Sequence, residues 1–221
     1  MLSPKAPKYS GRKIKMIDLY YWGTPNGMKI TIALEEMGLD YQIFPINILE
    51  NDQFQADFLK ISPNNKIPAI VDQQGPKGEA ISIFESGAIL QYLGRKTGLF
   101  YPKDEQQRVE VEQWLMWQMG GLGPMLGQNH HFSKFAPERI PYATDRYINE
   151  TKRLYGVLDK QLVGQDFVAG EYSIADMAIL PWLLRHEWQS VNLNDYPNVQ
   201  AYLARLKQRP AIQKALDLLT Q

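Results

Sequence analysis

The chain has 221 residues and carries 24 Lys and Arg against 24 Asp and Glu, so its formal net charge is zero. Hydrophobic residues make up 44% of the chain and charged residues 22%, which is typical of a folded protein and excludes disorder over most of its length. Without a basic excess we expect no nucleic-acid binding, and no apolar run reaches the roughly 18 residues that a membrane-spanning helix needs.

The chain contains no cysteine. Disulfides, zinc–thiolate sites, iron–sulfur clusters and a protein thiol nucleophile are therefore excluded, and any sulfur chemistry must use a thiol from another molecule. Residues 1–15 are basic and contain Pro4 and Pro7, with no apolar core after them. We expect a loosely ordered N-terminal arm there rather than a secretory signal, and a cytoplasmic location for the protein.

Residues 16–97 are predicted to form a small α/β domain. Runs rich in strand formers predict four strands, over 16–22, 41–46, 67–71 and 81–84. The spacing of apolar residues predicts two longer helices and a short one, over 28–37, 86–96 and 53–59. This order fits a βαβ unit followed by a hairpin and a helix, which gives a mixed sheet with helices on its faces.

A linker over 98–104 leads to residues 105–221, where helices alone are predicted. Five helical patterns are found there, over 106–119, 139–162, 174–187, 198–208 and 211–219. The glycine-rich stretch 120–124 should kink or end the first of these helices. Ser173 and Asp176 form a capping box at the start of the third, with Asp in place of the more usual Glu. An all-α domain is therefore expected after the α/β domain.

The turn between the first strand and the first helix, residues 22–27, is the first candidate for chemistry. Thr24 is a good N-cap and Pro25 suits the first helical turn. The free N–H groups of a helix N-terminus favour an anion and lower the pKa of a nearby thiol. The Thr24 hydroxyl and the Asn26 amide could each donate a hydrogen bond to a sulfur anion. Taken alone, the motif is more often an ordinary helix cap.

Two further motifs stand at the ends of elements in the same half. A cis bond between Ile67 and Pro68 would leave the Ile67 backbone free to pair with an extended peptide, but the sequence is equally that of a proline at a strand start. Glu85 could hold an ammonium group and Ser86 a carboxylate, although both could simply cap the next helix. Sites for a thiolate, an extended backbone and an amino-acid head group together match glutathione, γ-glutamyl-cysteinyl-glycine.

These motifs also carry a family resemblance. The strand order, Ile67-Pro68 and Glu85-Ser86 resemble the thioredoxin-like domain of cytosolic glutathione transferases, and the helical remainder resembles their C-terminal domain. Longer strings resemble the nu class, which includes bacterial glutathione-dependent disulfide-bond oxidoreductases; they span 24–27, 61–72, 84–89 and 120–132. The resemblance implies an α/β thioredoxin-like N-terminal domain followed by an all-α helical-bundle C-terminal domain.

The resemblance implies roles for ten residues. Thr24 and Asn26 would lie beside the glutathione sulfur as the catalytic residues, and Ile67, before a cis Pro68, would pair with the cysteinyl backbone. The other implied glutathione contacts are Gln53 near the glycine end, Lys66 beside Ile67, Glu85 and Ser86 at the γ-glutamyl head, and Gln113 and Arg146 reaching across a homodimer. Residue spacing alone would place Gln113 and Arg146 on a solvated helix face.

The implied activity is glutathione-dependent disulfide reduction. A bound glutathione thiolate would attack a small disulfide and a second glutathione would complete oxidised glutathione, with weak transferase or peroxidase activity beside it. One alternative is a transferase that conjugates glutathione to electrophiles. The other is a regulatory protein that binds glutathione without turnover.

Tyrosine and histidine residues are further candidates for the same site. Tyr20 or Tyr21 could contact the sulfur, although strand tyrosines usually serve packing. Adjacent histidines point in different directions, so His130 and His131 are expected to line the open side of the pocket rather than to bind a metal. The region around Trp182 is expected to be core and surface.

Overall fold

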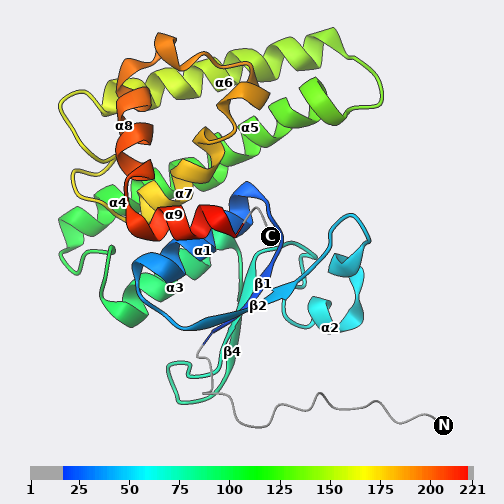
Figure 1. The fold of residues 1–221 in the computed structure, drawn as a ribbon, viewed down its shortest axis with the longest axis vertical. Coiled ribbons are helices and arrows are strands. Elements are labelled where there is room, and N and C mark those ends of the chain that lie inside the picture. The colour runs from blue at the N-terminus through cyan, green and yellow to red at the C-terminus, as the bar shows by residue number, and fades with distance from the viewer. Residues whose placement is uncertain (1–16, 219–221) are drawn as a thin grey trace.

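The computed structural model describes residues 17–218, so the predicted arm over 1–15 lies outside the described residues. Four strands form one mixed sheet of order β2-β1-β3-β4, in which β1 runs parallel to β2 and antiparallel to β3 (Figure 1). The strands are β1 (Ile17–Tyr21), β2 (Tyr41–Pro45), β3 (Ala69–Asp72) and β4 (Ile81–Phe84). The predicted α/β order is confirmed.

Side chains of β1 alternate between the two faces of the sheet, as the pleat requires. Ile17 and Leu19 are fully buried on the face covered by helices, whereas the Tyr20 ring stacks on Phe44 of β2, with 5.2 Å between ring centroids, and packs against Phe58. The helices of this half are α1 (Pro25–Glu36), α2 (Ala56–Leu59, after a 3₁₀ turn at Asp52–Phe54) and α3 (Ser86–Thr97). In Figure 1, α1 and α3 lie between the sheet and the helical half.

The second half consists of helices joined by loops, as predicted, and its described residues contain two isolated bridges within 167–171 but no strand. Its helices are α4 (Glu105–Trp117), α5 (Gly123–His130), α6 (Pro141–Gln161), α7 (Ile174–Leu183), α8 (Pro197–Lys207) and α9 (Pro210–Asp217). Within the described residues, no helix is both long and apolar enough to cross a membrane.

The glycine-rich stretch after α4 behaves differently from the prediction of a simple kink or end. The α-helix does end at Trp117, but the chain continues through a π-helical turn at Gln118–Leu122 directly into α5. A Cβ on Gly123 would lie 2.7 Å from the Gln118 side-chain nitrogen, so a larger residue here would displace the Gln118 side chain. Pro124 occupies the first turn of α5, where its missing N–H costs nothing.

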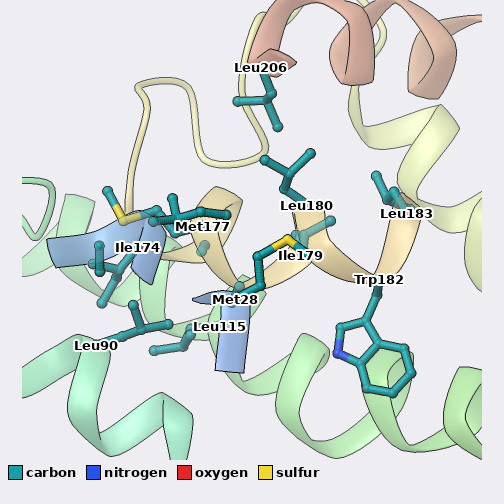
Figure 2. Close-up of a cluster of buried hydrophobic side chains, with 14 of the residues drawn as sticks. Met28, Leu90, Leu115, Ile174, Met177, Ile179, Leu180, Trp182, Leu183 and Leu206 are labelled. Carbon is teal, nitrogen blue, oxygen red and sulfur yellow. The ribbon is translucent and has the colours of Figure 1, made fainter. Parts of the chain in front are cut away.

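Helix α7 forms the centre of the core. All of its residues are buried, and an α-helix that is apolar all round must be enclosed on every side. Figure 2 shows Met28 of α1 and Leu115 of α4 beside Ile174 and Ile179 of α7, so one apolar cluster joins the two halves.

The predicted capping box at the start of α7 is confirmed. The Ser173 N–H donates to Asp176 Oδ2 at 2.8 Å, and the Ser173 hydroxyl oxygen accepts from the N–H of Ala175 at 3.3 Å. Asp176 also accepts from the Val168 N–H at 3.0 Å and the Tyr202 hydroxyl at 2.8 Å. A single buried carboxylate therefore satisfies donors from three parts of the helical half.

We predict that Asp176→Ala lowers the free energy of unfolding by about 3–5 kcal/mol, because several buried donors would lose their acceptor. Urea unfolding followed by circular dichroism measures this loss. Asp57→Ala, which removes an exposed carboxylate on α2, is the matched control and should leave the unfolding midpoint nearly unchanged. Equal effects of the two substitutions would contradict the assignment of Asp176 as a central acceptor.

Candidate functional site

A cavity of about 700 Å³ lies between the N-terminal ends of α1 and α3 and the helical half. Four of the ten predicted site residues line it: Asn26, Lys66, Glu85 and Ser86. The opposite wall comes from the π-helical turn, α5 and α7, and includes Gln118, Met119, Pro124, Gln128 and Trp182. Motifs that lie far apart in the sequence therefore meet at one site.

The turn before α1 has the geometry that its sequence predicts. Thr24 is the N-cap in extended conformation, and its hydroxyl oxygen accepts from the Gly27 N–H at 3.2 Å. A Cβ on Gly27 would lie 2.3 Å from the Trp22 carbonyl oxygen, so the tight turn requires glycine. Because Thr24 uses only its acceptor function here, its hydroxyl hydrogen can still be donated to a ligand.

The side chain of Asn26 is oriented by the helical half. The indole N–H of Trp182 donates to Asn26 Oδ1 at 3.2 Å. Because an indole N–H can only donate, its partner must be the amide oxygen of Asn26. The amide nitrogen of Asn26 therefore points away from Trp182. Within residues 17–218 that nitrogen has no acceptor, so it is free to donate into the cavity.

The loop before β3 is held in a fixed shape. The Ser62 hydroxyl donates to the Lys66 carbonyl oxygen at 2.8 Å, and Asn65 adopts a left-handed conformation with φ of 50°. The peptide bond between Ile67 and Pro68 is cis, as the family resemblance implies. Lys66 lines the cavity, and Ile67 and Pro68 follow it immediately before β3 without lining the cavity.

Glu85 stands at the N-cap of α3 in an unusual conformation. Its φ of 69° and ψ of 115° are rare for a residue other than glycine and cost on the order of 1–3 kcal/mol. The alternative that Glu85 caps the helix is wrong, because its side chain makes no capping hydrogen bond and instead accepts from Asn64 Nδ2 at 3.4 Å. The strained backbone thus presents an exposed carboxylate beside the first turn of α3.

A buried lysine that sequence reasoning missed lines the same cavity. Lys29 is 1% exposed, and its ammonium nitrogen donates to Gln118 Oε1 at 2.7 Å and lies 3.4 Å from Ser86 Oγ. Burial lowers the pKa of Lys29 to about 7, against a smaller opposing effect of Glu85. The sequence signal that could have found this residue is a single cation, Lys29, within the otherwise uncharged run 28–34. The structure buries every residue of that run.

Six of the ten predicted site residues do not line the cavity within one subunit. Thr24, Ile67 and Pro68 stand within two residues of a lining residue in the chain, whereas Gln53, Gln113 and Arg146 lie elsewhere. Gln53 precedes α2 and donates from Nε2 to the Ile48 carbonyl oxygen at 3.4 Å, while its buried Oε1 has no partner among the described residues. Gln113 on α4 lines a separate groove beside Trp114. Arg146 on α6 lines a third hollow.

The tyrosines of β1 do not fit a role as a thiolate partner. Burial raises the pKa of Tyr20, with a smaller contribution from Asp18, and burial also raises the pKa of Tyr21. Neither tyrosine lines the cavity. Both are packing residues, which agrees with the reading of the strand pattern.

The two histidines also lie differently from the prediction. His130 is buried behind Trp182, with 5.8 Å between the ring centroids, and Trp182 rather than His130 lines the cavity. Burial and the nearby Arg185 lower the pKa of His130 to about 4. His131 contacts the ring of Phe132. Among the described residues, no three His, Asp or Glu side chains are grouped so that they could hold a metal ion.

With this geometry established, the chain can be assigned to a family. The model of the glutathione S-transferase N-terminal domain matches residues 16–95, and that of the glutathione S-transferase C-terminal domain matches residues 124–210. The chain therefore belongs to the glutathione S-transferase family.

Two individual relatives are similar to the chain over most of its length. The chain is 53% identical to the disulfide-bond oxidoreductase YfcG of Escherichia coli over 91% of this chain and 94% of that protein. It is 42% identical to the disulfide-bond oxidoreductase YghU of the same organism, over 90% of this chain and 73% of that one.

Solved structures agree with this assignment. A glutathione transferase from Pseudomonas putida with one glutathione disulfide bound per subunit has a TM-score of 0.89 and 45% identity, and the match covers 93% of each chain. A glutathione transferase family member from Pseudomonas fluorescens with two glutathione molecules bound has a TM-score of 0.87 and 44% identity, covering 91% of this chain and 92% of the other.

The lowered pKa of Lys29 predicts a specific pH dependence of stability. Between pH 7 and about 10 the unfolded chain binds a proton at Lys29 that the folded protein does not, so the free energy of unfolding should rise with pH. Relative to Lys29→Met, the wild-type protein should gain up to about 1.4 kcal/mol per pH unit in this window. Urea unfolding of both proteins between pH 7.5 and 9 checks this, and parallel pH profiles would contradict it.

Proposed function

We propose that this protein is a glutathione-dependent disulfide-bond reductase. The observation that carries the proposal is the cavity in which the helix N-terminus at Asn26 and the head-group residues Glu85 and Ser86 meet. Because the chain has no cysteine, the reacting sulfur must arrive with the ligand. Family membership and two relatives named as disulfide-bond oxidoreductases support the same reaction.

Each predicted residue has a proposed part in binding glutathione. Thr24 and Asn26 donate hydrogen bonds to the sulfur, and Ile67 pairs with the cysteinyl backbone. Glu85 holds the α-ammonium group and Ser86 accommodates the α-carboxylate at the start of α3. The remaining proposed contacts within the subunit are Lys66 and Pro68 beside the cysteinyl unit and Gln53 toward the glycine end.

The proposed reaction is a pair of thiol–disulfide exchanges. The bound glutathione thiolate attacks one sulfur of a disulfide, forming a mixed disulfide and expelling the other sulfur as a thiolate. A second glutathione thiolate attacks the glutathione sulfur of the mixed disulfide and expels the second thiolate. Two glutathione molecules are oxidised to one disulfide, and their two thiol protons go to the two thiolates released.

The protein's contribution is to keep the first sulfur ionised. A helix N-terminus contributes about 0.3–1 kcal/mol toward an anion, and a hydrogen bond to a charged group about 1.5–3 kcal/mol. Since one pKa unit corresponds to about 1.4 kcal/mol, these interactions can lower a thiol pKa by one or two units. Two observations support these roles: Thr24 Oγ1 and Asn26 Oδ1 each accept a hydrogen bond, which leaves the hydroxyl hydrogen and the amide N–H groups to donate to a ligand.

We further propose that the protein is a cytoplasmic homodimer of the nu class. Gln113 and Arg146 lie away from the cavity of their own subunit, and a partner's cavity would give each a ligand to contact. The cytosol supplies the reduced glutathione that the reaction consumes. Residues 16–97 would form the glutathione-binding domain and 105–221 the helical domain, joined by 98–104.

We predict that replacing both Thr24 and Asn26 by alanine lowers kcat/KM for glutathione-dependent reduction of a small disulfide by about 10- to 100-fold, because two donors to the thiolate are lost. A coupled assay for oxidised glutathione measures this. Thr97→Ala, at the opposite end of α3, is the matched control. Unchanged turnover in the double variant would contradict these roles.

The same assay separates the alternatives. Faster turnover of an aromatic halide than of any disulfide would instead indicate a conjugating transferase. Glutathione binding without turnover of either substrate would indicate a regulatory protein.

The proposed dimer makes a second prediction. Arg146→Ala and Gln113→Ala should each weaken glutathione binding by about 3- to 10-fold, because each removes a polar contact from the neighbouring subunit. Calorimetry measures the affinity, and light scattering measures the mass in solution. A monomeric wild-type protein, or unchanged affinity in both variants, would show that the two residues have no such role.

A further inference from the structure

Lys29 has no part in the proposed reaction, yet it is the most deeply buried cation of the site. Its ammonium nitrogen contacts three groups, Gln118 Oε1 at 2.7 Å, Ser86 Oγ at 3.4 Å and Met119 Sδ at 3.7 Å, and none of them carries a charge. Among the described residues, no carboxylate lies within ion-pair distance of it. A buried lysine without a counter-ion is costly, so a role for its charge must be sought in what enters the cavity.

The groups around Lys29 define what that ligand can be. From the other elements that line the cavity, the ionisable side chains are Glu85 at the start of α3 and Lys66 in the loop before β3, both exposed. The helical half contributes Gln118, Met119 and Trp182, which do not ionise, and the His130 ring lies behind Trp182 with Arg185 beyond it. Ser86 thus has a cation, Lys29, at its hydroxyl group and an anion, Glu85, next to it in the chain.

We propose that Lys29 and Ser86 together bind the α-carboxylate of the γ-glutamyl group, so that Lys29 is the residue that selects for that carboxylate. This rests on the proposed glutathione site and adds a residue to it. Ser86 is 6% exposed, lines the cavity together with Lys29, and has its hydroxyl oxygen 3.4 Å from the ammonium nitrogen, so a carboxylate bound at Ser86 comes close to the ammonium group. Glu85 and Lys29 then recognise the two opposite charges of one amino-acid head group.

Ligand binding and protonation are coupled in this arrangement. In the free protein, burial holds the pKa of Lys29 at about 7, so much of the lysine is neutral just above that pH. An arriving carboxylate favours the charged form, and the site therefore takes up a proton as it fills. Glutathione binding should consequently weaken as the pH rises from 7 to 9.

A peptide pair tests the selection directly. 4-Aminobutyryl-cysteinyl-glycine is glutathione without its α-carboxylate. Calorimetry at pH 7 should show that Lys29→Met weakens glutathione binding by about 10- to 100-fold but changes the affinity for the analogue by less than about 3-fold. The matched control is Lys66→Met, which removes a cation from the same cavity and should affect the two peptides equally.

Two outcomes of this comparison would overturn the proposal. One is unchanged glutathione affinity in Lys29→Met. The other is an equal loss for both peptides, since that would mean that Lys29 acts only on the shape of the site.

Proton uptake provides a test that needs no variant. S-methylglutathione keeps the head group and has no thiol to titrate. Calorimetry of its binding to the wild-type protein at pH 8, in buffers of different ionisation enthalpy, should report an uptake of about one proton per site. Binding without proton uptake would overturn the proposal even if Lys29→Met failed to fold.

The two tests also separate this inference from the proposed function. If glutathione binds but disulfides are not reduced, the reductase proposal fails and the role of Lys29 is still decided by the peptide pair. If disulfides are reduced but Lys29→Met keeps full selectivity for the carboxylate, only the role of Lys29 is lost.

Discussion

The enclosure of α1 between the sheet and the helical half is the constraint on which the rest of the structure depends. Its residues 27–34 are all buried, and α7 and α9 pack against it from the helical half. Three polar links join it to that half along its length. Asn26 accepts from Trp182 near the first turn, Lys29 donates to Gln118 one turn later, and Glu36 accepts two hydrogen bonds from Arg209 at the last turn, at 2.6 and 2.8 Å.

Burial of this helix gives the site its electrostatic character. A helix terminus in water is screened, but the N-terminus of α1 faces a cavity walled by protein, where its partial positive charge acts over a longer range. The same enclosure deprives Lys29 of water and places Asn26 in a fixed orientation. In the proposed function, a chain without cysteine would in this way hold another molecule's sulfur as a thiolate, with donors whose positions are set before the ligand arrives.

Local signals were sufficient to predict the strands and the N-terminal caps of α1 and α7. The Thr24 cap, the capping box of Ser173 and Asp176, and the strand over 81–84 depend on neighbours in sequence, and the structure has them where they were predicted. Helix α5 was missed, because its glycines and proline indicate a break, whereas the π-helical turn lets the chain remain helical. Such a turn depends on Gly123 packing against Gln118, a contact that propensities do not contain.

The parts of the site that were not predicted all come from contacts between the two halves. Lys29 drew no prediction from its sequence, and its role depends on Gln118 of the helical half, which accepts from its ammonium group. The region around Trp182 was expected to be core and surface, and nothing in its sequence indicated that the Trp182 indole N–H contacts Asn26. Periodicity assigns a residue to a face of its own helix, but it does not say which helix covers that face. For Gln113 and Arg146, the relevant surface would belong to a second copy of the chain.

The hydrogen bond from Trp182 to Asn26 has a consequence for how this family can diversify. Asn26, a proposed donor to the reacting sulfur, belongs to the α/β half, but its side chain is oriented by an indole that is 156 positions further along the chain. A helical domain exchanged between paralogues would therefore retune sulfur reactivity without altering a single amino acid of the thioredoxin-like half. Selection for new substrates and selection for thiolate chemistry would both act on α7, the helix that carries Trp182.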